Sequence, residues 1–323
     1  MQIERIAVDD LDLGLAGSLA AIDNAALDGR PLRHHSAETF LLECRDRGGE
    51  GPDQALWLAR SDDEVVGWAA LTLNLYENLD GAKILGAVHP DHQRRGIGRA
   101  LMTEAEAATD RLRLRAPAWA GTAGELAVPA LGYVRSSSHE VRRLSLRRAQ
   151  PEALVAEARE AAADYDLERL RGPCPDDLLD DMRVLREAIN GGPADGEFEA
   201  YPAERIRRYE QWLDAQRQTS YTLVARHRDS GHPAGITIVC VHELRPAIAA
   251  QEDTSVLAPH RGRRLGLRLK LEMLDWLRVE RPDVEATDTW NVPENRPMVA
   301  INDAIGCRVV AETIAFRKHR QPL

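Results

Sequence analysis

The 323-residue chain is poor in several residue types, and each shortage excludes a class of protein. Its four cysteines, Cys44, Cys174, Cys240 and Cys307, lie far apart and form no CxxC pair. We therefore expect neither a disulfide framework nor a structural zinc site. No stretch approaches the roughly 18 apolar residues that a membrane-spanning helix needs. The opening MQIERIAVDD also lacks the apolar centre of a signal peptide, so we expect a cytoplasmic location.

Lysine is scarce as well, with only Lys83, Lys270 and Lys318, and the formal net charge is -10. Binding to phosphate backbones and anionic lipids depends mainly on clustered Lys and Arg. We therefore expect no nucleic-acid partner and no membrane partner, and either a monomer or a homodimer. The ten histidines form no HxxH-plus-carboxylate arrangement, so no metal site is expected.

One short motif occurs twice, as HPDHQRRGIGRALM (89–102) and PHRGRRLGLRLK (259–270). Gln93 and Arg261 begin the two loops 168 residues apart, and the later Gly132 and Gly306 are 174 apart. Hairpin, strand and helix patterns follow the same order around both copies. This order predicts a duplicated α/β (α+β) unit with a mixed, mostly antiparallel twisted sheet flanked by helices. The expected domains are 1–148 and 164–323, joined by a helical linker at 149–163.

Each copy places a strand, a basic loop with glycine and then a helix. Amide groups at a helix start lack partners inside the helix and lie at its positive dipole end, which favours bound phosphate. Glycine lets the backbone turn sharply and approach a ligand. One copy alone could be an ordinary strand–turn–helix, but two copies in matching context favour a pyrophosphate cradle. Neither copy is a GxGxxG dinucleotide motif or a Walker loop.

The first motif, QRRGIG, resembles the Q/R-x-x-G-x-G/A pattern of the GNAT superfamily of acetyl-CoA-dependent N-acetyltransferases. The second half resembles a GNAT subgroup through DTSVLAPHRGRRLG (253–266), TWN (289–291) and NRPMVAINDAIG (295–306). In that subgroup a basic residue often takes the first glycine position, as Arg264 does here. The resemblance implies two tandem GNAT domains, with acetyl-CoA as co-substrate and the primary amine of a small molecule as acceptor.

The resemblance also assigns cofactor contacts to the end of one strand, the loop and the first helical turn of each half. In the first half these are Val88, Gln93, Arg94, Arg95, Gly96, Ile97 and Gly98. In the second half they are Val256, Leu257, Arg261, Gly262, Arg263, Arg264, Leu265, Gly266, Asn291 and Asn295.

Glu252 and Asp253 are the candidate bases, because bases in this superfamily often lie on the strand before the cradle. Strand alternation puts Glu252 on the face of Val256, with Asp253 on the opposite face unless a β-bulge intervenes. Either carboxylate alone could equally belong to a solvated strand edge. At the matching positions the first half has Ile84 and Leu85, which carry no proton.

The family's usual acid, a tyrosine seven residues after the Asn that opens the last helix, is replaced by Asn302. An amide can donate a hydrogen bond to a thiolate but is no general acid. We therefore expect catalysis by direct transfer in the second domain. The first domain would bind CoA without turnover or form a structural wall. Two alternatives remain: a non-catalytic acyl-CoA-binding scaffold, and acetylation of a protein or peptide.

Overall fold

The computed structural model describes residues 1–27, 35–46, 55–74, 78–191 and 200–321. The chain divides into two compact units, Met1–His139 with Ala311–Leu323, and Glu140–Val310. Each unit is a mixed, mostly antiparallel sheet flanked by helices, so the predicted fold class is confirmed. Within the described ranges, no helix has both the length and the apolar character needed to cross a bilayer.

The sheet of the first unit has the strand order β1-β2-β3-β4-β5-β13. Its strands are β1 (Gln2–Ile6), β2 (Ala55–Ser61), β3 (Glu64–Leu73), β4 (Gly81–Val88), β5 (Arg113–Arg115), β6 (Ala118–Trp119), which pairs with β13, and β13 (Arg308–His319). Only β4 and β5 run parallel; the other neighbouring pairs are antiparallel. The hairpin of β2 and β3 turns through Asp62 and Asp63, which both have positive φ.

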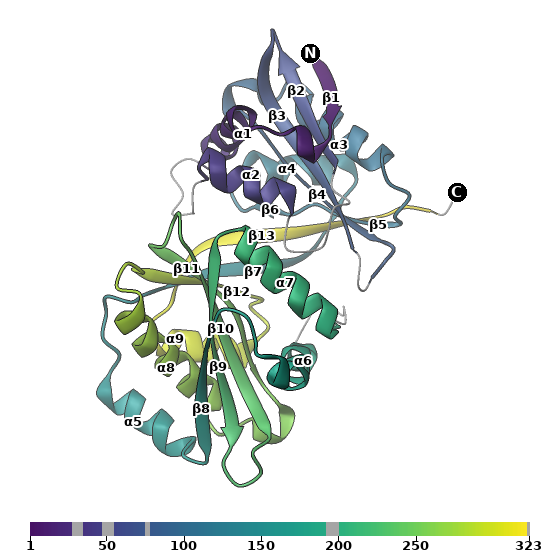
Figure 1. The fold of residues 1–323 in the computed structure, drawn as a ribbon. Helices are drawn as coiled ribbons and strands as arrows, with labels where there is room; N and C mark the ends of the chain where they lie inside the picture. Colours follow the sequence, from purple (N-terminus) through teal and green to yellow (C-terminus); the bar gives the residue numbers. More distant parts are fainter. Residues whose placement is uncertain (28–34, 47–54, 75–77, 192–199, 322–323) are drawn as a thin grey trace. The chain divides into compact units, whose positions relative to one another are not determined.

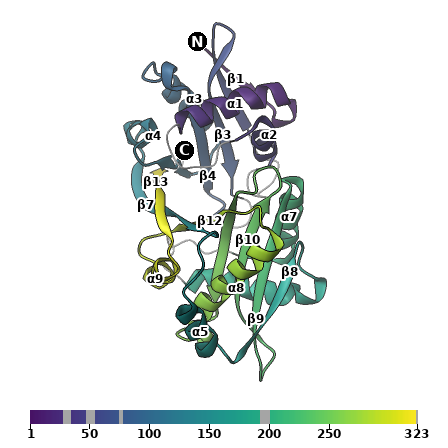
Figure 2. The same ribbon diagram turned by 90° about the vertical axis from the view of Figure 1, so that its left-hand side faces the viewer.

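Helices cover both faces of this sheet (Figures 1 and 2). They are α1 (Leu13–Ala26), α2 (Ala37–Arg45), α3 (Ile97–Ala107) and α4 (Ala123–Ala127). On one face α3 buries Ile97, Leu101 and Ala105, the spacing that the sequence predicted. On the other face α1 and α2 pack around Phe40 and Trp68.

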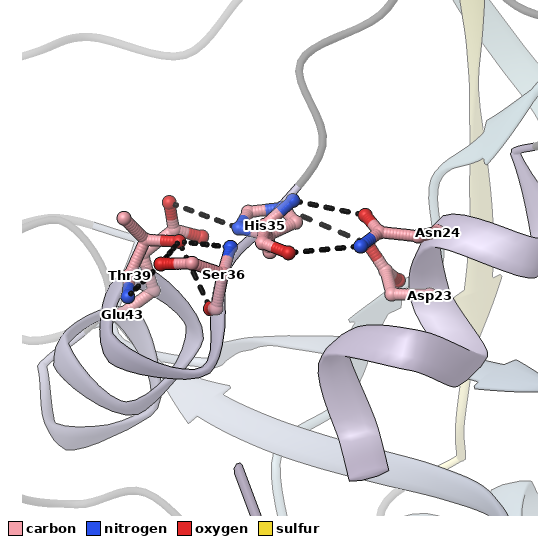
Figure 3. A network of polar contacts seen from close by, with 6 residues as sticks. All are labelled: Asp23, Asn24, His35, Ser36, Thr39 and Glu43. Carbon is pink, nitrogen blue, oxygen red and sulfur yellow. Dashed lines mark hydrogen bonds and ion pairs between the residues drawn. The ribbon is translucent and has the colours of Figure 1, made fainter. Parts of the chain in front are cut away.

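A polar network joins α1 to α2 on that second face (Figure 3). The Asn24 side chain exchanges two hydrogen bonds with the His35 backbone, at 2.8 and 2.9 Å. Ser36 and Thr39 form a capping box that fixes the start of α2.

The sheet of the second unit has the order β7-β12-β11-β10-β9-β8. Its strands are β7 (Val134–Ser145), β8 (Tyr165–Arg171), β9 (Gln218–His227), β10 (Pro233–His242), β11 (Ile248–Val256) and β12 (Ala286–Asn291). Its helices are α5 (Glu152–Ala161), α6 (Leu179–Glu187), α7 (Ala203–Ala215), α8 (Leu265–Glu280) and α9 (Arg296–Ala304). One face packs against α8 and the other against α6 and α7 (Figures 1 and 2).

The last strand of each half pairs with the other half's sheet. In the second unit, Glu140–Ser145 of β7 pairs with β12, supported by a two-pronged ion pair from Arg143 to the buried Asp288. In the first unit, β13 pairs with β5, and its Ile314 and Phe316 are buried in the core around α3. Figure 1 shows this strand, in yellow, beside β5. The two halves have therefore exchanged their closing strands.

The observed units differ from the predicted domains in three places. Residues 140–148 of the expected first domain, 1–148, belong to the second unit. The expected second domain, 164–323, loses the segment Ala311–Leu323 to the first unit, because of the strand exchange. The expected linker, 149–163, is helical as predicted, but it belongs to the second unit. Ala158 and Ala162 are fully buried in the core beside α8, so α5 is an integral helix.

Candidate active site

The two motifs form closely matching strand–loop–helix elements. In the second unit β11 ends at Val256, a short 3-10 helix spans Ala258–His260, and α8 begins at Leu265. In the first unit β4 ends at Val88, a 3-10 helix spans Pro90–His92, and α3 begins at Ile97. The loop residues are Gln93, Arg94, Arg95 and Gly96 in one copy and Arg261, Gly262, Arg263 and Arg264 in the other. Leu257 precedes the second 3-10 helix, and Gly98 and Gly266 lie in the first helical turns.

The difference in glycine placement has a conformational explanation. Both loops hold two residues of positive φ, separated by one residue. In the first loop these are Arg94 (60°) and Gly96 (83°), whereas in the second they are Gly262 (79°) and Arg264 (54°). In the first loop Arg occupies the first left-handed position and Gly the second. In the second loop the order of Gly and Arg is reversed. The backbone path is preserved although the glycine has moved.

A side chain fixes each loop to the strand before it. Gln93 donates from Nε2 to the carbonyl of Val88 at 3.0 Å, and Arg261 donates from Nε to the carbonyl of Val256 at 2.9 Å. The first helical bonds then run from Ala100 to Gly96 and from Arg268 to Arg264. The amides before them have no acceptor inside the helix and lie at the positive end of the helix dipole. Both loops therefore suit an anion.

A matched pair of glycines brings each helix start close to its sheet. A Cβ on Gly67 would lie 3.3 Å from the Leu101 side chain, and one on Gly235 would lie 3.2 Å from that of Leu269. The two glycines are 168 residues apart, the same spacing as the motifs. Both halves therefore need a residue without a side chain at this position, which lets the helix after the loop pack closely on the sheet.

The strand before each loop separates from its parallel neighbour. Pairing of β11 with β12 ends at Gln251 and Thr289, and pairing of β4 with β5 ends at Lys83 and Arg115. Beyond these points, one edge of β11 and of β4 faces no parallel partner strand. A ligand with amide groups can pair with such an edge as an added strand would.

The strand before the loop has a β-bulge in the second unit and pairs regularly with its antiparallel neighbour in the first. Asp253 pairs with Ile238 of β10 and Gln251 pairs with Val239, so Glu252 is the extra residue. The amide of Gln251 donates to the carbonyls of Ile238 and Asp253 at 2.8 and 3.0 Å. This side chain thereby satisfies carbonyl groups that the interrupted ladder leaves without a regular partner.

The bulge corrects the predicted faces of the strand. Val256 packs against the core beside α8, but Asp253 shares the opposite face with Ile238. Glu252 is the extra, exposed residue of the bulge, and together with Asp253 it raises the pKa of Arg186 of α6. The bulge interrupts the strand alternation on which the expected shared face of Glu252 and Val256 depends.

The two carboxylates differ in surroundings. Asp253 is buried and accepts a hydrogen bond from the Ser255 hydroxyl at 2.7 Å. Glu252, the extra residue of the bulge, is exposed. In the first unit β4 runs through Ile84 and Leu85 in unbroken register, so neither the bulge nor the carboxylates recur there.

Aromatic residues and an arginine, which the sequence analysis did not single out, complete this region. The Arg186 guanidinium lies over the rings of Tyr201 at 4.7 Å and Tyr209 at 5.6 Å. Burial lowers the pKa of Arg186, but Tyr201, Asp253, Tyr209 and Glu252 raise it by more. A signal was present, since Arg186 follows Met182 by four residues on the buried stripe of α6.

The predicted amides gather around α9. Asn295 accepts from the Met298 amide and caps the helix start, as expected for the residue that opens it. Asn302 is fully buried and donates to the side chain of Asn291, at the end of β12, at 2.7 Å. Its own side-chain oxygen is buried and accepts no hydrogen bond within the described residues.

His260, beside the second loop, belongs to an aromatic cluster. Its Nδ1 lies 3.0 Å from the hydroxyl of Tyr165, and the tilted ring of His227 lies 5.7 Å away between centroids. Burial, His227 and Arg263 lower the pKa of His260. The ring is therefore neutral at pH 7 before any anion binds.

A family model described as an acetyltransferase (GNAT) domain matches residues 52–131. No match was found among curated proteins. Among solved structures, the chain is similar to a tandem GNAT protein from the clavulanic acid biosynthesis pathway, solved without acetyl-CoA. The identity is 25%, the TM-score is 0.77 and 100% of both chains is covered.

Two more distant structures share the fold. A GCN5-related N-acetyltransferase from Sphaerobacter thermophilus matches with 19% identity and a TM-score of 0.72, over 99% of this chain and 97% of that one. A glucosamine N-acetyltransferase region of a fungal multi-domain GH3 β-N-acetylglucosaminidase matches with 15% identity and a TM-score of 0.67, over 98% and 38%. The matched domain at 52–131 and the likeness to a tandem GNAT protein over the whole chain together support a tandem-domain GNAT acetyltransferase.

Proposed function

We propose that the protein is an acetyl-CoA-dependent N-acetyltransferase that acts on the primary amine of a small molecule, with catalysis in the second unit. The observation that carries this proposal is the bulge at Glu252. Glu252 and Asp253 lie where β11 separates from β12, on the strand that leads into the second loop. The first unit has a matching loop but regular pairing and apolar residues at the corresponding positions of β4.

The residues of the second loop fit acetyl-CoA. A Cβ at Gly262 would meet no atom within 4 Å, so open space lies above this left-handed turn. The open edge of β11 near Val256 suits the amides of the pantetheine arm, and the loop from Arg261 to Gly266 suits the pyrophosphate. When bound, acetyl-CoA supplies the thioester that is the acyl donor. The same groups of the first unit, Val88 and Gln93 to Gly98, would hold a second molecule without turnover.

Glu252 is the proposed base. Its exposure lets an incoming ammonium group reach it, and it accepts the proton that the amine must lose before attack. Asp253 is already held by Ser255 and adds negative charge beside it. In the transfer a C–N bond forms while the C–S bond breaks, and the departing thiolate takes up a proton from solvent. Proximity of the two reactants supplies much of the rate.

Asn302 acts through Asn291 in this proposal. Because Asn302 is fully buried, its amide orients the Asn291 side chain, at the end of β12 where the strands separate. Asn291 is then the group that donates to the departing thiolate. This arrangement replaces a tyrosine acid with a hydrogen-bond donor and lets the thiolate leave without a general acid.

The test measures acetyl transfer by the purified protein to a panel of amines. The release of the free CoA thiol reports each transfer. Glu252→Gln should lower kcat by roughly 10²- to 10⁴-fold, as expected for loss of a base, and leave acetyl-CoA affinity unchanged. Glu280→Gln, at the far end of α8, is the control with the same loss of charge. Acetyl-CoA binding without transfer to any amine would favour the non-catalytic alternative. Failure to bind acetyl-CoA in calorimetry would refute the proposal.

A further inference from the structure

Arg186 differs from the other arginines around it. Arg207 pairs with Asp176 and Glu210, and Arg226 pairs with carboxylates of its own. Arg186, in contrast, makes no hydrogen bond and no ion pair within the described residues; its contacts are with aromatic rings. The residue is half-buried, and its guanidinium carries five N–H donors.

The aromatic rings hold this guanidinium in place. Tyr201 and Tyr209 both lie within cation–π distance of Arg186, and Tyr209 stacks on Trp212 with ring centroids 5.4 Å apart. The side chain is therefore oriented without using its hydrogen-bond donors. A planar, preoriented fork of this kind binds a carboxylate through two parallel hydrogen bonds.

The region beside Arg186 carries the opposite charge. Glu252 and Asp253 lie on the bulge of β11, the strand against which α6 packs, and both carboxylates raise the pKa of Arg186. Yet no ion pair joins them to Arg186, and Asp253 is engaged by Ser255. A cation with unused donors and an exposed carboxylate thus border the same site. They complement a molecule with one ammonium group and one carboxylate.

We propose that the acceptor is an amino acid or a similar amine bearing a carboxylate, which Arg186 binds while Glu252 takes the amine. This inference rests on the proposed transferase function and names its substrate class. Because Arg186 contacts the distal carboxylate rather than the reacting nitrogen, its loss should act mainly on the KM of the acceptor. The KM of acetyl-CoA should stay unchanged.

The experiment compares acceptors with and without the carboxylate, at concentrations corrected for the fraction of free amine. Glycine, β-alanine and L-lysine are assayed against glycinamide, β-alaninamide and cadaverine. For the preferred pair, the wild type should favour the carboxylate member by roughly 10- to 100-fold in kcat/KM, the range expected for hydrogen bonds to a charged group. Arg186→Met should abolish this preference by raising the KM of the carboxylate member, and Arg186→Lys should restore part of it.

Arg205→Met is the matched control. Arg205 lies over the same Tyr201 ring at 4.7 Å, but its guanidinium donates to the carbonyl of Ala200. Its replacement should leave the preference intact. Calorimetry with the six amines on CoA-saturated protein gives a readout without turnover, in which the carboxylate members should bind more tightly and Arg186→Met should remove the difference.

The two proposals fail in different ways. Transfer to amides and amino acids at equal rates would overturn the acceptor class and leave the transferase function standing. A carboxylate preference that survives Arg186→Met would overturn the role of Arg186. If no amine were acetylated, calorimetry would still test this inference. Equal affinities for the carboxylate and carboxylate-free member of each pair would overturn it. If Arg186→Met failed to fold, the carboxylate preference of the wild type and its reduction in Arg186→Lys would still test the role of Arg186.

Discussion

Replacing Lys270 with Met should make the second unit more stable at neutral pH. Lys270 lies inside α8 and is only 4% exposed. It borders a cavity of about 10 Å³, near the smallest volume that holds a water molecule, which is also lined by Gln251 and Thr289. Burial lowers the pKa of Lys270 to about 8, although Cys307 and Asp253 partly oppose this shift.

The magnitude follows from that pKa. The ordinary value is 10.5, and at about 1.4 kcal/mol per pH unit the difference amounts to about 3 kcal/mol. Below pH 8 the lysine is protonated both folded and unfolded, so the whole cost of the buried charge is present. Between pH 8 and 10.5 the folded protein loses the proton first, and the wild type gains stability. Met has a similar length and no charge, so we expect a gain of about 1–3 kcal/mol at pH 7.

Urea denaturation at pH 7.0 and pH 9.5 measures this effect. The advantage of Lys270→Met over the wild type should shrink by about 2 kcal/mol between the two pH values. Lys318→Met, which removes a lysine that pairs with Glu106 in the first unit, controls for general loss of charge. A destabilised Lys270→Met protein at pH 7, or a difference independent of pH, would refute the reasoning. Either result would mean that the ammonium group is bound productively in the fold.

Three further predictions concern the bulge, the loop and the exchanged strand. Gln251→Met should destabilise the second unit by about 2–4 kcal/mol, because two buried carbonyls lose their donor; urea denaturation that shows no loss would contradict the role given to this side chain. Arg264→Gly should leave stability nearly unchanged in the same assay, since relief of the left-handed backbone offsets an exposed ion pair with Glu157, and calorimetry should show only modestly weaker acetyl-CoA binding. Phe316→Ala should cost the first unit about 3–5 kcal/mol, and hydrogen exchange that placed the loss in the second unit would argue against strand exchange.

The sequence predicted the repeated architecture because its signals are local. Glycine and arginine at fixed spacing mark the loop, and apolar spacing marks the helix behind it, as Ile97 and Leu101 illustrate. The repeated offset then predicts two units of one plan. The moved glycine could not be explained from the sequence alone. Only the backbone angles show that each loop has two left-handed positions.

The strand exchange was out of reach for a different reason. The alternating patterns of β7 and β13 fit either half's sheet equally well, because both halves share one plan. The choice of partner depends on long-range contacts such as that of Arg143 with Asp288. The predicted boundary at 164–323 therefore failed at its end, although the order of elements was right.

The sequence identified Glu252 and Asp253 as candidate bases, but it did not predict the bulge on which they lie. Simple alternation put Glu252 and Asp253 on opposite faces, and the bulge at Glu252 interrupts that alternation. Its supporting residue, Gln251, looks in the sequence like any polar strand residue. Arg186 was missed because an arginine on an apolar helical stripe is as consistent with solvent exposure as with a site.

The assignment of catalysis to the second unit is the central claim, and two matched variants test it most directly. Gly98→Val and Gly266→Val place the same bulk in the first turn of α3 and of α8, where a Cβ would lie 3.4 Å or more from its nearest neighbour. Acetyl transfer to the best amine of the panel should be lost in Gly266→Val and retained in Gly98→Val, with both proteins folded by circular dichroism. Loss of transfer in Gly98→Val alone would contradict the account and move the active site to the first unit.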